Sequence, residues 1–295
     1  MFEVNESPLD RGLVTANTNP YRGDNQAYIN KAENNMSAFT ADIVKTRNRL
    51  QEKNPDLVRE IQEVYNLYYG LFLLPPNMEL DHLPDAEKTM AARVGHNITH
   101  HVMYSSQPEA EEGFIVGVYR ATAMMQEVAS QFLNNQQDCA FAKFWSGIKS
   151  ELAVVRVLST VGCQVWLPEY TVCFDPKLDE TFQFDVRSGV DIIAQFNNRV
   201  FLVDAKGRAE LPVPEISHRK ISDSELTNLL LRRTVGGLKP ESIYRTKVVI
   251  PSRECGYLNQ QSVSGNTRVY QEQLSKLGRL PDSITKSIIQ ALDLK

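Results

Sequence analysis

Residues 189–207 read GVDIIAQFNNRVFLVDAKG, and this stretch decides how the rest of the chain is interpreted. Two apolar runs rich in β-branched residues flank Asn197-Asn198, a dipeptide that accepts the positive φ values of a two-residue hairpin turn. Pairing the strands across that turn sets Asp191 opposite Asp204, because the loop length fixes the register. The stretch therefore predicts a β-hairpin with two acidic side chains at its open end.

Side chains alternate between the two faces of a strand, so Lys206 is expected on the same face as Asp204. Two opposed carboxylates with Cβ atoms about 5 Å apart repel each other unless a cation lies between them. In a simpler interpretation both acids are solvated and Lys206 neutralises one of them. However, both faces of the hairpin are apolar between Ile192 and Val203, which is typical of an interior strand pair. Acids at the end of such a pair need partners, since an uncompensated buried carboxylate costs several kcal/mol.

Upstream, residues 146–162 read SGIKSELAVVRVLSTVG and have the apolar spacing of a helix. Ser146 is the predicted N-cap, and Gly162 is placed where a C′ glycine ends a helix. Glu151 lies beside the apolar stripe, although an acid in a first turn is also favoured by the helix dipole alone. Residues 163–174, CQVWLPEYTVCF, read as a strand that follows the helix.

In this order, Glu151, Asp191 and Asp204-Ala205-Lys206 resemble the pattern of the PD-(D/E)XK nuclease superfamily. That pattern is an acidic residue on a helix, a strand ending near a metal-binding Asp, then Asp or Glu, any residue and Lys on the next strand. The resemblance covers about residues 140–255. One departure is Gly189-Val190, which precedes the first Asp where the family often has Pro.

The resemblance implies an α/β fold with a restriction-endonuclease-like core, in which helices flank a mixed central sheet. It also implies a Mg²⁺ site, with Mn²⁺ as a substitute, formed by Asp191, Asp204 and the Ala205 carbonyl, and completed by Glu151 through water. Mg²⁺ accepts such a partial oxygen shell because it keeps several waters. Lys206 would orient the attacking water or stabilise the charge of the transition state. The implied activity is metal-dependent phosphodiester hydrolysis by an endonuclease, in which all four side chains are catalytic.

Charge is distributed unevenly and gives weak support for a nucleic-acid partner. Residues 1–136 carry a net charge of −7 and residues 137–295 one of +3, while 207–280 reach +5. Candidate phosphate contacts in the basic part are Arg219, Lys220, Arg232, Arg233 and Arg253. For each of them taken alone, an ordinary solvated surface position is the default interpretation. DNA is favoured over RNA as the substrate, and an RNA-cleaving enzyme is the alternative.

Three regions are predicted along the chain. Residues 1–35 are rich in Asn, Asp, Gly and Pro and are expected to form an irregular arm. Residues 36–136 are expected to form an α-helical domain, and 137–295 the nuclease-like domain. Helices are predicted at 37–52, 55–73, 85–94, 109–134, around Leu226–Leu231 and at 281–294, with a further strand at 244–252.

Composition excludes several other classes of protein. Four scattered cysteines without a Cys-x-x-Cys pair argue against a disulfide framework or a structural zinc cluster. His96, His100 and His101 resemble half of a zinc motif, but Asn97 replaces the Glu of HExxH. The N-terminal residues do not resemble a signal peptide, and no apolar run approaches the roughly 20 residues of a membrane span. We therefore expect a cytoplasmic protein without a membrane partner; a homodimer is compatible with the sequence.

Two further functions stay open at this level. A nucleic-acid-binding or adaptor protein can use a nuclease fold whose catalytic site has decayed, although the presence of all of Asp191, Asp204 and Lys206 argues against decay. A helical adaptor whose partner contacts lie in residues 36–136 is the third alternative. Cleavage assays on DNA and RNA distinguish these functions.

Overall fold

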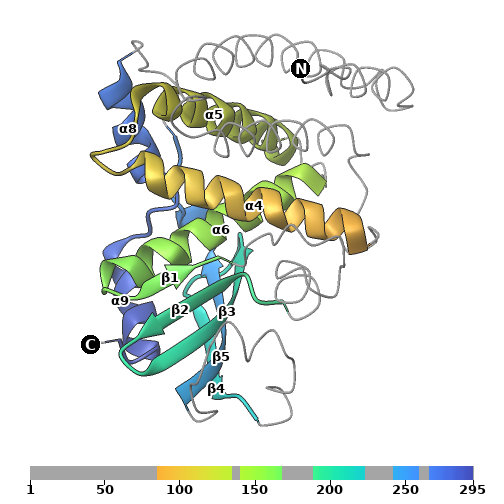
Figure 1. Ribbon diagram of the computed structural model, residues 1–295. Helices are drawn as coiled ribbons and strands as arrows, with labels where there is room; N and C mark the ends of the chain where they lie inside the picture. The colour runs from red at the N-terminus through yellow and green to blue at the C-terminus, as the bar shows by residue number, and fades with distance from the viewer. Residues whose placement is uncertain (1–84, 135–139, 168–188, 223–241, 259–265, 295) are drawn as a thin grey trace. The chain divides into compact units, whose positions relative to one another are not determined.

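The computed structural model describes residues 85–134, 140–167, 189–222, 242–258 and 266–294 (Figure 1). The chain divides into two compact units. One contains the sheet and comprises, among the described residues, 85–100, 146–167, 189–222, 242–257 and 275–294; the other comprises 101–134, 140–145, 258 and 266–274. None of the described helices is both long enough and apolar enough to span a membrane.

The sheet has five strands in the order β1-β2-β3-β5-β4. The strands are β1 (Gln164–Trp166), β2 (Ile192–Phe196), β3 (Arg199–Arg208), β4 (Glu215–Lys220) and β5 (Ile243–Pro251). β3 and β5 run parallel, while every other neighbouring pair is antiparallel. The expected α/β class with a mixed sheet flanked by helices is therefore confirmed.

The hairpin of β2 and β3 has the register that its two-residue turn dictates, with Ile192 paired to Val203. Of the two turn residues only Asn197 has a positive φ, of 53°. At the open end the strands depart from the regular pairing that was expected to oppose Asp191 and Asp204. The Asp191 N–H donates to the Val203 carbonyl at 2.8 Å, so two successive residues of this strand face one residue of β3.

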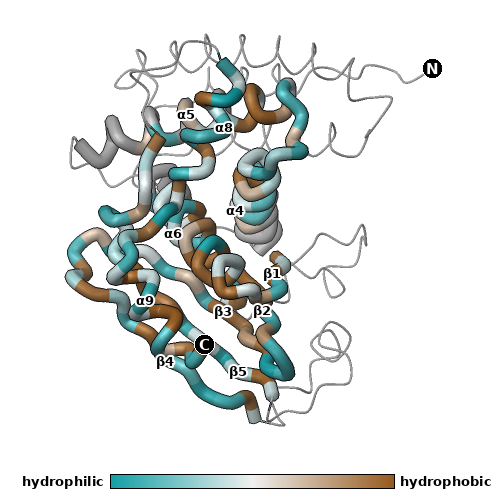
Figure 2. Tube along the Cα trace, turned by 90° about the vertical axis from the view of Figure 1, so that its left-hand side faces the viewer, coloured by the Kyte–Doolittle hydropathy of each residue, from teal (hydrophilic) through white to brown (hydrophobic). Residues whose placement is uncertain are grey.

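Both faces of this hairpin are buried, as its apolar sequence predicts. The residues exposed by 2% or less are Ile192, Ile193, Ala194, Val200, Phe201, Leu202 and Val203. Figure 2 shows hydrophobic stretches in these two strands and in the helix α6 (Ala140–Thr160). Because both faces are packed, the hairpin is held firmly, and with it the end of β3.

Helix α6 begins six residues before the predicted start, so the prediction of Ser146 as an N-cap is wrong. Ser146 lies within the helix, and its carbonyl accepts a hydrogen bond from Ser150 Oγ at 2.8 Å. The preceding sequence, AFAKFW, is itself compatible with helix, so a serine of N-cap type does not mark the boundary there.

The predicted end of α6 is confirmed. Gly162 has a φ of 82°, and its N–H donates to the Ser159 carbonyl at 3.1 Å. The N–H of Cys163 donates to the Leu158 carbonyl at 3.1 Å, which completes a Schellman motif. This cap directs the chain from the helix into β1.

Within the sheet unit, α6 packs against both β3 and the C-terminal segment. Its Leu152 is fully buried and lies against Gly278, where an added Cβ would lie 2.8 Å from Leu152 Cγ. Arg156 Nε donates to the Leu277 carbonyl at 2.8 Å. Burial, and to a lesser extent Arg279, lowers the pKa of Arg156 to about 10. These contacts fix the helix that carries Glu151.

The other described elements are α4 (Asp85–Ser105), α5 (Glu112–Asn134), η6 (Ser252–Glu254), α8 (Thr267–Lys276) and α9 (Asp282–Ala291). The helices predicted at 109–134 and 281–294 and the strand at 244–252 are confirmed, and the helix at 85–94 is longer than expected. β4 is not predicted by the sequence because, as an exposed edge strand, it lacks a continuous apolar run. The predictions for 1–84 and for Leu226–Leu231 lie outside the described residues.

Candidate active site

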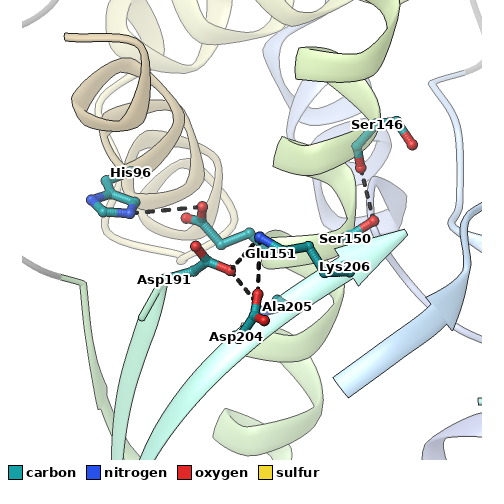
Figure 3. A network of polar contacts seen from close by, with 8 residues as sticks. All are labelled: His96, Ser146, Ser150, Glu151, Asp191, Asp204, Ala205 and Lys206. Atoms are coloured by element: carbon teal, nitrogen blue, oxygen red, sulfur yellow. Dashed lines mark hydrogen bonds and ion pairs between the residues drawn. The ribbon is translucent and has the colours of Figure 1, made fainter. Parts of the chain in front are cut away.

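Four predicted site residues converge at the open end of the hairpin (Figure 3). Asp191 directly precedes β2, Asp204 and Lys206 lie on β3, and Glu151 reaches toward them from α6. Lys206 Nζ lies 2.9 Å from Asp204 Oδ1 and 3.8 Å from Asp191 Oδ2. The ammonium group therefore lies between the two carboxylates, where their like charges require a cation.

The carboxylate of Asp191 is held in place by the neighbouring main chain. Its Oδ2 accepts a hydrogen bond from the Ala205 N–H at 2.7 Å. In a regular ladder that N–H would donate to a main-chain carbonyl of the partner strand. The side chain thus replaces a ladder carbonyl, and the irregular pairing at Asp191 fixes the orientation of its carboxylate.

Exposure increases from the acids toward the lysine. Glu151 and Asp191 are each 7% exposed, and the side chain of Asp204 is 19% exposed. The Lys206 side chain is 52% exposed, so its ammonium group can contact both the acids and a ligand from solvent. Buried carboxylates cost free energy unless they are compensated, and here the compensation comes from the half-exposed lysine.

The oxygen atoms at this site fit a hard divalent cation. Asp204 Oδ1 is buried and, its ion pair with Lys206 apart, accepts no hydrogen bond within the described part of the chain. Asp191, Asp204 and the Ala205 carbonyl offer oxygen ligands only, the type that Mg²⁺ prefers. No group of three or more His, Cys, Asp or Glu side chains is arranged as a ligand set in the described residues. One or two carboxylates plus a substrate phosphate suffice for Mg²⁺, so a larger protein cage is not needed.

His96, on α4, is a site residue that the sequence analysis does not find. The imidazole is 4% exposed, and its Nε2 lies 4.0 Å from Glu151 Oε2 (Figure 3). The His-x-x-x-His-His spacing does not indicate this contact, because His96 and Glu151 are brought together by tertiary packing. The His101 ring lies in a different environment and packs edge-on against Phe114, with centroids 5.3 Å apart.

Three of the five predicted phosphate contacts lie within the described residues. Arg219 and Lys220 are exposed neighbours on β4, so their side chains point to opposite faces of the sheet. Arg253 is exposed in η6. Arg232 and Arg233 lie outside the described residues.

Comparisons of the chain with protein-family models, with curated proteins and with solved structures found no match. A function for this chain therefore has to be inferred from the arrangement of its own residues. The cluster of ionisable side chains at the end of β3 is the arrangement from which we infer it: Glu151, Asp191, Asp204 and Lys206.

Proposed function

We propose that this chain is a metal-dependent nuclease that hydrolyses phosphodiester bonds, with DNA favoured over RNA, on a restriction-endonuclease-like core. The single observation that carries the proposal is the contact of Lys206 with both Asp191 and Asp204 beside the buried Glu151. An exposed ion pair contributes little to stability, whereas the Asp191 carboxylate is buried and is oriented by the Ala205 N–H. Together the three acids offer oxygen ligands for a metal ion that assists phosphate hydrolysis, and the lysine adds a positive charge beside them.

Asp191 and Asp204 would hold Mg²⁺ or Mn²⁺ together with the Ala205 carbonyl, and Glu151 would contribute through water. When bound, the cation supplies positive charge to the scissile phosphate and lowers the pKa of a water molecule. The hydrogen bond from the Ala205 N–H keeps the Asp191 carboxylate oriented before any ligand arrives. Such preorganisation removes a reorganisation cost at the moment of reaction.

Lys206 has the exposure of a group that meets substrate. Its half-exposed ammonium neutralises the acids in the protein alone, and a cation at the same acids would take over that role. Lys206 could then donate hydrogen bonds to the phosphate or hold the attacking water, since an ammonium has three donors on a flexible stem. Its contribution belongs to catalysis rather than to metal binding.

His96 would position Glu151. A buried carboxylate next to a buried imidazole is restrained in its orientation, which favours one arrangement of the water that Glu151 is proposed to hold. His96 is therefore a positioning residue and not a catalytic one in this proposal.

Cleavage of supercoiled DNA, single-stranded DNA and RNA, each with Mg²⁺ and with EDTA, tests the proposal. Lys206→Ala should cut the single-turnover rate by about 10²-fold, the scale of losing one preorganised electrostatic contact. Arg208→Ala is the matched control, because it removes the same charge two residues further along β3, where Arg208 pairs with Glu215 at 3.8 Å. It should retain the rate within about twofold, since a single rim charge mainly affects association.

Cleavage by Lys206→Ala at the parental rate would refute the catalytic role of the cluster. Binding of nucleic acid without any Mg²⁺-dependent cleavage would instead favour the non-catalytic alternative. In that case the ion pairs of Lys206 are structural, and Lys206→Ala should lower the stability of the protein.

A further inference from the structure

Three aromatic rings pack together on one face of the sheet beside the edge strand β4. The rings of His218 and Tyr244 are stacked, with centroids 4.5 Å apart and planes inclined by 13°. Phe201 stacks with both of them, at 5.6 Å from His218 and 5.8 Å from Tyr244, with planes inclined by 28° and 23°. Phe201 is fully buried, whereas His218 is exposed and Tyr244 is half-buried. His218 and Tyr244 therefore offer aromatic surface to solvent, and both stack with a buried ring.

The orientation of the His218 ring is restrained. Its Nδ1 lies 3.0 Å from the hydroxyl of Thr246, a fully buried residue that pairs with it across the two strands. Burial, and in addition the charge of Arg199, lowers the pKa of His218 below its usual value. The ring is thus held by stacking on one side and by a hydrogen bond at its edge. A preorganised ring loses little conformational entropy when a ligand stacks on it.

Cationic side chains flank the rings. Lys220 is exposed and pairs directly with Tyr244, so it lies on the same face of the sheet. The Arg199 guanidinium carbon lies 5.6 Å from the centroid of the Phe201 ring. Asp293 compensates Arg199, with Oδ2 at 3.4 Å from Nη1, and its own side chain is 85% exposed. The surface combines two flat rings with one exposed ammonium group and one guanidinium that is partly neutralised.

We propose that this aromatic platform, formed by Tyr244 and His218 with Lys220 at its rim, binds an unpaired base of a single-stranded nucleic acid. Flat rings and nearby cations bind single strands without sequence preference, because every base has a π-face and every nucleotide a phosphate. A duplex hides its base faces in the stack, so the platform should discriminate against it. The inference depends on the proposed function only for the choice of nucleic acid as the ligand.

The platform is separate from the acid cluster. Phe201 precedes Asp204 by three residues on β3, about 10 Å along the strand, and side chains three residues apart point to opposite faces. A strand bound at the platform would pass the β4 edge of the sheet and not the carboxylates directly. The platform would therefore hold a single-stranded segment at a distance from the nucleotide that is cleaved, and it would contribute to which substrates bind.

Fluorescence anisotropy with a labelled oligonucleotide of about 12 nucleotides tests this, a length within the usual site size of such surfaces. EDTA is present throughout, so that binding is measured without cleavage. The single strand should bind more tightly than the duplex of the same sequence. His218→Ala should weaken single-strand binding about tenfold, the usual scale for losing one stacked base. Ser217→Ala, a change on the opposite face of the same exposed strand, is the control and should bind like the parent.

Two further variants keep the test decisive if His218→Ala does not fold. Lys220→Gln should reduce the slope of log affinity against log salt by about 0.7, the value for one phosphate contact on a single strand. Asp293→Asn should raise the affinity, because it removes an exposed carboxylate that competes for Arg199. Asn also accepts the positive φ of 51° at this position.

A folded His218→Ala with parental affinity would overturn the platform, as would a preference for the duplex. Unchanged salt slope in Lys220→Gln together with unchanged affinity in Asp293→Asn would also overturn it. The proposed nuclease function fails separately, when the parent binds single strands in EDTA but does not cleave them with Mg²⁺. If the parent cleaves with Mg²⁺ and all platform variants bind single strands normally, only the platform proposal is refuted.

Discussion

Replacement of Gly207 by alanine is the perturbation whose consequences the structure defines most closely. Gly207 follows Lys206 on β3 and faces α6. A Cβ atom there would approach Ser150 Oγ well inside 3.0 Å, the limit for real Cβ contacts, and would lie 3.0 Å from Ser252 Cβ and 3.3 Å from Ser146 Oγ. Two serines of α6 and one of η6 thus surround the position that the methyl group would take.

These neighbours have little freedom to move. Ser150 is fully buried, and its hydroxyl is held by the Ser146 carbonyl at 2.8 Å; Ser252 is only 7% exposed. Insertion of one methyl group into a packed site of this kind costs about 1–3 kcal/mol. We expect Gly207→Ala to lose stability in that range, and to lose activity as well, because the shift of β3 displaces the adjacent Lys206.

Urea denaturation followed by circular dichroism measures the loss as a lower midpoint at an unchanged m-value. Ser150→Ala removes the closest atom, so the double variant Gly207→Ala/Ser150→Ala should recover part of the stability. The coupling energy of that cycle should be about 1 kcal/mol, since the two residues are in contact. If Gly207→Ala is as stable as the parent, or the double variant is merely additive, the packing of α6 on β3 is not as described.

Three further predictions test other parts of the sheet unit. Mg²⁺ should raise the thermal midpoint of the parent through binding linkage, and Asp204→Asn should lose most of that rise; a full rise in this variant would exclude Asp204 as a ligand. Gly256→Ala should be more destabilising than Gly207→Ala in urea, because its Cβ would collide with the Lys276 carbonyl, a main-chain atom that cannot rotate away. Burial raises the pKa of the Cys255 thiol from 9.0 to about 11, a change that Lys149 partly opposes. Since the unfolded thiol ionises first, stability should fall by about 2–3 kcal/mol as the pH rises from 9 to 11, and Cys255→Ala should reduce that fall in denaturation series at each pH.

The sequence predicts the hairpin well because local rules decide it. The turn Asn197-Asn198 fixes the register, and two-sided apolarity fixes the burial of the strands. Both signals lie within 19 residues and need no knowledge of the rest of the fold. The end of α6 at Gly162 is predictable for the same reason, since a C′ glycine acts on its own helix.

Features that depend on distant segments are not predictable in this way. The start of α6 is misplaced because Ser146 has the chemistry of an N-cap but not its position. β4 is missed because an edge strand needs no apolar run when its partner β5 supplies the hydrogen bonds. The contact of His96 with Glu151 joins residues 55 positions apart and has no signature in either local sequence.

The departure from regular pairing at Asp191 links the fold to the proposed chemistry. Regular pairing would leave the Ala205 N–H bonded to a carbonyl and the Asp191 carboxylate without a fixed orientation. In the structure the Asp191 side chain accepts that hydrogen bond. The carboxylate directly before β2 is therefore both buried and fixed in its orientation. Asp191→Ala should therefore remove a ladder contact as well as a charge, and should destabilise the protein even without metal. Asp191→Asn keeps an acceptor for the Ala205 N–H, so it should retain more stability than Asp191→Ala while losing the metal-induced rise. Equal stability of the two variants would show that the hydrogen bond contributes nothing, and that the carboxylate is not oriented by the strand.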